Sequence, residues 1–236
     1  MRSHTMSNNH INYEIKHKNR TSIRILIDSL GNLEIHVPKG TTEEAIQHFL
    51  KGKWDIIEQK VREVKERQNG PKQRNYDEGE TFLYLGRNYP IQINHDTTIS
   101  QDYVVFEGDT LYVYVNVLED EKVKQALRHF YYKQCKALVE ESIAFYQSYF
   151  KMKPRSIRIT DSKKNWGTCD GERKLTFNWR LAMAPREVLD YVVVHEMCHM
   201  MHMNHDRSFW RLVGKIMPDY KEKERWLAVS NWKMTV

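Results

Sequence analysis

The feature that most constrains the fold of this chain is the run of residues 195–199, which reads His-Glu-Met-Cys-His. In a helix, side chains four positions apart lie on one face about one turn apart, so both imidazoles can bind a single metal ion. Glu196 then lies roughly 60° around the helix axis from His199, beside the ion. Apolar residues 191–194 bury the start of this helix, where a His-Glu-His group without a metal is costly to desolvate. The sequence therefore predicts a metal-binding helix with Glu196 as the candidate catalytic base.

A third protein ligand has to come from outside this pair, because a catalytic zinc site takes three protein ligands and keeps a fourth position for water. His202 and His205 are the nearby candidates. On an unbroken helix, His202 would lie about 10 Å along the axis from His195, which is a poor arrangement for convergence on one ion. If the chain turns near Asn204, a residue type that tolerates helix ends, His205 can return towards the pair. The spacing favours His205 and keeps His202 as the alternative.

The composition favours a reducing compartment. The chain has 236 residues and three cysteines, an odd and sparse count that excludes a small secreted domain held together by disulfides. No apolar stretch approaches the roughly 18 residues that a membrane-spanning helix needs, and residues 1–20 lack a signal-peptide segment. We therefore expect a cytoplasmic protein without a membrane anchor, and we leave residues 1–5 out of the fold prediction.

Residues 7–117 are predicted to form a strand-rich N-terminal region. Alternating apolar residues indicate strands between residues 11 and 37, and two helices follow, one capped by Thr41 and one over residues 54–67. Polar residues with Gly and Pro predict a linker near residues 68–75. Runs of β-branched and aromatic residues predict four further strands, over residues 81–85, 89–93, 103–106 and 111–115.

Residues 118–236 are predicted to form a second domain. Residues 120–150 contain neither Gly nor Pro and predict one long helix. Strands are expected over residues 156–160 and 174–179, on either side of a loop. Three later helices are expected, starting at Pro185, near Asp206 and near Pro218. The fold class is therefore α+β, with a strand-rich N-terminal part followed by a small sheet, the metal-binding helix and C-terminal helices.

Several short motifs cluster in the second domain. They are Asn-Trp-Gly-Thr-Cys at residues 165–169, Asn-Trp-Arg at 178–180, Val-Val-Val-His-Glu at 192–196, Asn-His at 204–205 and Pro-Asp-Tyr at 218–220. Together they resemble the YgjP-like predicted zinc metallopeptidases, relatives of the SprT-like proteases. The resemblance is strong from about residue 150 to residue 230, and it extends to the N-terminal half only in the order and length of the elements.

The resemblance implies a hydrolase with a zincin-like metallopeptidase domain over residues 118–236, acting on a peptide or protein substrate. It implies one zinc ion per chain, held by His195, His199 and His205. Zinc in such a site lowers the pKa of water to about 7. Glu196 would then take the proton of the water and return it to the leaving amine.

Four residues are candidates for substrate binding: Asn165, Trp166, Asn178 and Tyr220. Asn165, Arg180 and Tyr220 are also candidates for a second donor to the oxyanion. The strand over residues 174–179 alternates apolar and polar residues and is expected in the core sheet, where its edge could accept an extended peptide as an added strand.

Two other functions remain open at this stage. Residues 51–74 carry eight basic and four acidic side chains, so a nucleic-acid-associated protease or DNA-binding module is one alternative. A metal-bound scaffold without turnover is the other, although a purely structural zinc site has no use for a base beside the metal. The sequence makes no prediction of the oligomeric state or of the identity of the substrate.

Overall fold

The computed structural model describes residues 2–6, 9–28, 32–68, 74–162 and 164–236. The chain divides into two compact units, Met1–Lys72 and Gln73–Val236, which we describe separately. This division differs from the expected boundary at residues 117–118, because the strands between residues 81 and 115 share one hydrophobic core with the C-terminal helices. Most of the expected linker, residues 69–73, lies outside the described residues.

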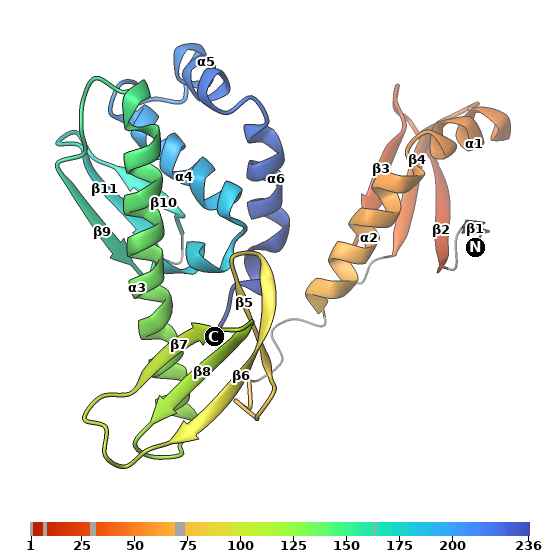
Figure 1. The fold of residues 1–236 in the computed structure, drawn as a ribbon. Helices are drawn as coiled ribbons and strands as arrows, with labels where there is room; N and C mark the ends of the chain where they lie inside the picture. The colour runs from red at the N-terminus through yellow and green to blue at the C-terminus, as the bar shows by residue number, and fades with distance from the viewer. Residues whose placement is uncertain (1, 7–8, 29–31, 69–73, 163) are drawn as a thin grey trace. The chain divides into compact units, whose positions relative to one another are not determined.

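The first unit is a four-stranded sheet with two helices (Figure 1). Its elements are β1 (Arg2–Met6), β2 (Asn9–Lys18), β3 (Arg24–Ile27), β4 (Leu33–Pro38), α1 (Glu43–Lys51) and α2 (Trp54–Gln68). The strand order is β1-β2-β4-β3, with β2 and β4 parallel and β3 antiparallel to β4. The core joins alternate residues of β4 to one face of each helix and includes Leu33, Ile35, Val37, Ile46, Leu50, Trp54, Ile57 and Val61.

Two details of the first unit differ from the sequence prediction. Residues 2–5, which were left out of it, belong to β1, and this strand pairs with β2. The cap of α1 is Thr42 rather than Thr41, since the Thr42 hydroxyl accepts a hydrogen bond from the Ala45 N–H at 3.3 Å. The Thr41 hydroxyl instead donates to the Pro38 carbonyl at 2.9 Å and so ties the chain to the end of β4.

The second unit begins with a sheet that packs on a long helix. The strands are β5 (Thr81–Tyr84), β6 (Arg87–His95), β7 (Tyr103–Glu107) and β8 (Thr110–Val115), in the order β5-β6-β8-β7. The helix α3 (Asp120–Tyr146) ends in a 3₁₀ turn, Gln147–Tyr149. The four strands and the long helix confirm the sequence prediction.

A smaller sheet and three helices complete this unit. The strands β9 (Ser156–Thr160), β10 (Gly167–Cys169) and β11 (Lys174–Asn178) lie in the order β10-β11-β9. A 3₁₀ helix, Trp179–Met183, leads into α4 (Arg186–His199), and α5 (Arg207–Ile216) and α6 (Tyr220–Ser230) follow. The expected loop between β9 and β11 thus contains a strand, β10. Because β11 is paired on both sides, the prediction that its edge could take up a peptide was wrong.

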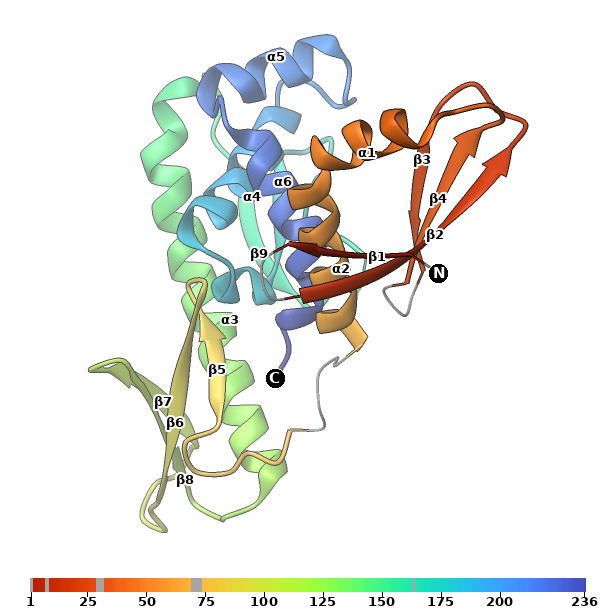
Figure 2. The same cartoon turned by 90° about the vertical axis from the view of Figure 1, so that its right-hand side faces the viewer.

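The helix α4 is central to this unit. It lies between α3 and α6 in both views (Figures 1 and 2), and it also contacts α5 and β10. Ten of its residues are buried. No helix among the described residues is long and apolar enough to cross a membrane.

The start of α4 is held by the turn between β5 and β6. The Gly86 N–H donates to the Met183 carbonyl at 3.0 Å. Gly86 has a φ of +81°, and a Cβ atom there would lie 2.8 Å from Cγ of Pro185. Only glycine fits this position without strain or displacement. The turn of the first sheet is therefore in direct contact with the point from which α4 begins.

Candidate metal centre and substrate cleft

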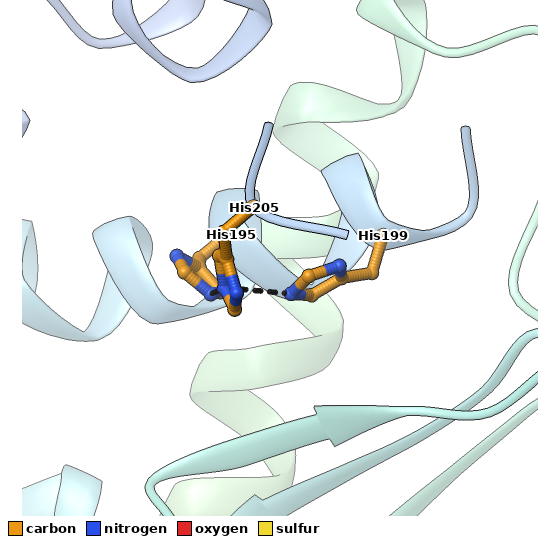
Figure 3. Close-up of side chains that lie close together, drawn as sticks. All are labelled: His195, His199 and His205. Atoms are coloured by element: carbon orange, nitrogen blue, oxygen red, sulfur yellow. Dashed lines mark hydrogen bonds between the residues drawn. The ribbon is translucent and has the colours of Figure 1, made fainter. Parts of the chain in front are cut away.

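Three imidazoles converge at the end of α4 (Figure 3). His195 and His199 come from α4, and His205 comes from the turn that follows it. The Nε2 atom of His205 lies 2.9 Å from that of His195 and 3.1 Å from that of His199. Around a tetrahedral zinc ion with bonds of about 2.0–2.1 Å, ligand nitrogens are separated by about 3.3 Å. The spacing and the chemistry of this donor set therefore fit one zinc ion.

The protonation states also suit a metal. Burial, followed by the nearby His199 and His205, lowers the pKa of His195 to about 3, and its Nδ1 is buried with no partner among the described residues. Burial also lowers the pKa of His199. Neutral imidazole is the form that binds metals. The neighbouring thiols are poor ligands by comparison, since burial raises the pKa of Cys198 to about 12 and that of Cys169 to about 11.

The rival candidate, His202, lies outside the cluster and supports it. Its carbonyl oxygen lies 3.0 Å from Nδ1 of His199. A hydrogen bond from Nδ1 to this carbonyl leaves the lone pair of His199 on Nε2, facing the other histidines. The His202 ring points elsewhere, with its Nδ1 3.1 Å from the Ser208 hydroxyl. The structure therefore brings His205, and not His202, to the pair on α4.

The turn at His205 ends in a helix cap. Asp206 precedes α5, and its carboxylate accepts hydrogen bonds from the N–H groups of Ser208 and Phe209, both at 2.9 Å. Both the cap and the start of α5 near Asp206 match the sequence prediction. Because Asp206 directly follows His205, the cap limits where the third imidazole can lie.

Glu196 is the buried carboxylate beside this cluster. Only 5% of its surface is exposed, and this desolvation raises its pKa to about 8. A cation at the histidines would favour the charged form. A Cβ atom on Gly167 would lie 2.6 Å from Cγ and 2.7 Å from Oε1 of Glu196. The edge strand β10 and the carboxyl group are therefore in direct contact, and glycine at residue 167 is what makes room.

A cleft of about 370 Å³ opens beside Glu196. It lies between the loop at residues 164–167, the helix α4 and the helix α6. The residues that line it are Lys164, Asn165, Trp166, Gly167, Tyr191, Val192, His195, Glu196, Glu224, Leu227 and Ala228. Two of the four candidate substrate-binding residues, Asn165 and Trp166, are therefore in the cleft that contains Glu196.

The other two candidates have structural surroundings. Asn178 is buried, and its amide donates to the Ser162 carbonyl at 2.7 Å while its side-chain oxygen accepts from the Arg180 N–H at 3.0 Å. It thus holds the loop that carries Asn165. Tyr220 stacks between other rings, 5.3 Å from Trp210 and 6.5 Å from Tyr191, and does not line the cleft.

Arg180, which was also considered as an oxyanion donor, is paired with Asp161. Its guanidinium lies over the Trp179 ring, 4.4 Å from the centroid. Arg180 does not line the cleft beside Glu196. Its surroundings are those of an ion pair next to the small sheet.

An aromatic wall behind the histidines was not predicted as part of the site. Phe209 is fully buried, and its ring centroid lies 4.9, 4.5 and 4.7 Å from those of His195, His199 and His205, respectively. Trp210 stacks on His205 at 5.6 Å. Neither aromatic is among the candidate site residues named from the sequence. Their amphipathic pattern shows a buried face but not which residues that face covers.

Comparisons with known proteins bear on this site. The family model described as YgjP-like, metallopeptidase domain, matches residues 21–230. No curated protein matches the sequence. Among solved structures, that of the metallopeptidase zymogen of Pyrococcus abyssi abylysin is similar over 40% of this chain and 92% of its own, with 23% identity and a TM-score of 0.34. The family match covers most of both compact units, and the chain belongs to the YgjP-like metallopeptidase family, a group of peptide-bond hydrolases.

Proposed function

We propose that this protein is a zinc-dependent metallopeptidase, with one zinc ion per chain held by His195, His199 and His205 and with Glu196 as the general base. The observation that carries the proposal is the convergence of three Nε2 atoms beside a buried carboxylate. A zinc site that only stabilises the fold is closed by four ligands and needs no such carboxylate. The arrangement therefore favours an enzyme over a metal-bound scaffold.

Each residue has a defined part in hydrolysis. A zinc ion acts as a Lewis acid that lowers the pKa of water to about 7. Glu196 accepts a proton from the attacking water and passes it to the leaving amine. The burial of Glu196 keeps competing solvent away from its carboxyl group, and Gly167 sets the space in which that group can move.

The edge strand β10 offers a place for the substrate backbone. Among the described strands it pairs with β11 alone, and its first residue, Gly167, is both in contact with Glu196 and part of the cleft. A peptide that adds as a strand beside β10 would use main-chain hydrogen bonds and would present its own backbone to Glu196. Asn165 and Trp166 would then contact the side chains of the substrate.

Metal analysis and peptide hydrolysis with four variants test the proposal. The wild type should hold about one zinc ion per chain, and His205→Ala should lose it, whereas His202→Ala should keep it because the His202 contact with His199 is made by the backbone. Glu196→Gln should keep the zinc ion and lose hydrolysis of casein. His199→Ala should lose both.

Two results would contradict the proposal. One is a purified wild-type protein that binds no metal, and the other is Glu196→Gln with undiminished hydrolysis. Loss of zinc in His202→Ala but not in His205→Ala would reverse the assignment of the third ligand without ending the metallopeptidase proposal.

A further inference from the structure

The first unit contains a groove of its own, which we call the β3–α2 groove. Its volume is about 470 Å³, and it lies between β3 and α2. The lining residues are Ile25, Leu26, Ile27, Lys53, Ile56, Ile57, Lys60, Glu63 and Val64. Six of these nine side chains are aliphatic, so the lining of the groove is mainly apolar. It belongs to the unit that contains none of the proposed metal ligands.

One wall of the groove is an open sheet edge. β3 is the last strand in the order β1-β2-β4-β3, and of the strands that the structure describes it pairs with β4 alone. On its other side, the backbone of residues 24–27 has no hydrogen-bond partner among the described residues. An unpaired edge of this kind is a template for another strand.

The other wall is a stripe of α2 that the sheet leaves uncovered. Ile56 is 51% exposed although it lines an apolar groove. Ile25 and Ile27 are partly buried and face the same side as the core, because their register partners Ile35 and Leu33 are buried. One more strand beside β3 would lie beneath Ile56 and extend the core by one row.

Two of the three charged side chains that line the groove are lysines. Lys53 and Lys60 are exposed, and neither ammonium group forms an ion pair with a described residue. The third charged side chain of the lining, Glu63, accepts a hydrogen bond from the neutral amide of Gln59 at 2.9 Å and keeps its negative charge, so the lining carries a net charge of +1. The two lysines are seven positions apart, or about 10 Å along a helix, with Ile56 between them. This spacing corresponds to about three residues of an extended strand.

We propose that the β3–α2 groove binds an extended segment of another protein, apolar at its centre and acidic at both ends, as an added strand beside β3. Backbone hydrogen bonds to β3 give the affinity, and the apolar centre covers Ile56. The flanking carboxylates pair with Lys53 and Lys60. The proposal does not rest on the metallopeptidase function, because every residue it uses lies in the first unit.

Two other occupants are less well matched to these features. A nucleic acid would use the lysines but would leave Ile56 and its apolar neighbours uncovered, because its affinity comes from phosphate contacts. A second copy of this chain would bring a sheet edge but also the same pair of lysines. A strand that is acidic at its ends and apolar at its centre would pair with the edge of β3, cover the apolar stripe of α2 and place carboxylates beside the two lysines.

A designed peptide tests the proposal. The probe is fluorescein-labelled Glu-Glu-Val-Val-Glu-Glu, whose inner glutamates are three residues apart, or about 10 Å in an extended strand. It is titrated with the full chain carrying Glu196→Gln, and binding is followed by fluorescence anisotropy. We expect saturable binding that is at least tenfold weaker for the peptide with four lysines in place of the glutamates. A peptide N-methylated at alternate residues should also bind at least tenfold more weakly, since it cannot complete the strand.

Variants locate the binding site. Ile56→Glu should weaken binding at least tenfold, whereas Leu118→Glu, which places the same charge on a side chain that is 62% exposed in the other unit, should not. A chain with both Lys53→Glu and Lys60→Glu should prefer the lysine peptide. Circular dichroism of each variant establishes that the fold is retained, and hydrogen exchange of residues 24–27 should slow when the peptide binds.

Several outcomes would overturn the proposal. These are equal affinity for the two peptides, binding that Ile56→Glu does not change, or displacement of the peptide by a 20-base-pair DNA duplex. A concentration-dependent dimer in sedimentation that Ile56→Glu abolishes would assign the groove to a second copy of the chain. Peptide hydrolysis and zinc content report on the metal centre separately, so failure at the groove is distinguishable from failure of the proposed enzyme.

Discussion

Gly167 and Glu196 show how closely the proposed catalytic base is packed. A Cβ atom at residue 167 would lie 2.6–2.9 Å from three atoms of the Glu196 side chain. Gly167→Ala should therefore displace the carboxyl group, and misplacing a catalytic group by about 1 Å can cost about 100-fold in rate. We expect a loss of that order in kcat with unchanged zinc content, measured by peptide hydrolysis and metal analysis.

Gly171→Ala is the matched control for this prediction. Gly171 lies in the turn between β10 and β11, and a Cβ atom there would meet nothing within 4 Å. The peptidase activity of Gly171→Ala should remain within about twofold of wild type, because a surface substitution that meets no neighbouring atoms has little effect on the fold. Equal losses in the two variants would point to a general effect on the loop rather than to contact with Glu196.

The residues of the site differ in how far the sequence could predict them. His195, Glu196 and His199 follow from helical geometry, and His205 follows from a turn that Asn204 and Asp206 favour. The role of His202 could not be read in this way, because its contact with His199 uses a backbone carbonyl that every residue type possesses. The need for glycine at residue 167 depends on a contact between segments that are distant in sequence.

Among the helices, α5 matters for the site through its N-terminal cap. Asp206→Ala removes the acceptor for two backbone N–H groups, which typically costs about 1 kcal/mol of free energy of unfolding. Since the neighbouring His205 then loses a fixed position, zinc affinity should fall by about tenfold, the lower end for residues that orient a ligand. Competition with a fluorescent chelator measures this change.

Two further substitutions separate the cap from general destabilisation. Asp206→Asn keeps a capping side chain and should retain most of the zinc affinity. Thr42→Ala removes the equivalent cap of α1 in the other unit and should leave zinc affinity unchanged. A similar loss of zinc affinity in Thr42→Ala and Asp206→Ala would refute the local explanation.

The turn between β5 and β6 governs where α4 starts. Gly86 and Gly79 have nearly the same positive φ, +81° and +80°, but only a Cβ atom on Gly86 would clash with Pro185. Gly79→Ala should cost about 1 kcal/mol of free energy of unfolding, from backbone strain alone. Gly86→Ala should cost about 1–3 kcal/mol more because of overpacking.

Urea denaturation of both variants measures the difference between these costs. If Gly79→Ala and Gly86→Ala lower the free energy of unfolding equally, the contact with Pro185 does not contribute to stability. The turn would then not determine the position of α4, and the two sheets of the second unit would be coupled only through their shared core.

At the level of elements, the helices and the longer strands could be predicted from the periodicity of apolar residues. The three-residue strand β10 did not, because Gly-Thr-Cys has no strand pattern and its order comes from pairing with β11. The same limit explains the domain boundary. The strands β5–β8 have the same kind of strand pattern as the N-terminal strands. Their packing in one core with α3 and α4 depends on contacts between segments that are distant in sequence.

In the whole molecule, the two cores are separate and the proposed metal site lies in one of them. Zinc should therefore stabilise the second unit and leave the first unchanged, since a ligand stabilises only the unit that binds it. A free zinc concentration 100-fold above Kd adds about 2.7 kcal/mol to the free energy of unfolding of the unit that binds it. The Tm of a domain of this size changes by about 2–4 °C for each kcal/mol. We expect the Tm of one calorimetric transition to fall by about 5–10 °C when a chelator removes zinc.

The two transitions can be assigned by substitution. Ile57 is buried in the first unit. Ile57→Ala should reduce the free energy of unfolding of this unit by about 2–5 kcal/mol, as is typical of such core truncations. It should therefore lower the Tm of only that transition whose Tm does not depend on zinc. His199→Ala should make the other transition insensitive to the chelator. If the chelator shifted both transitions in the wild type, the units would unfold as one cooperative structure. The separate cores would then not behave as independent domains, and the groove on β3 and α2 would have to be considered together with the metal centre.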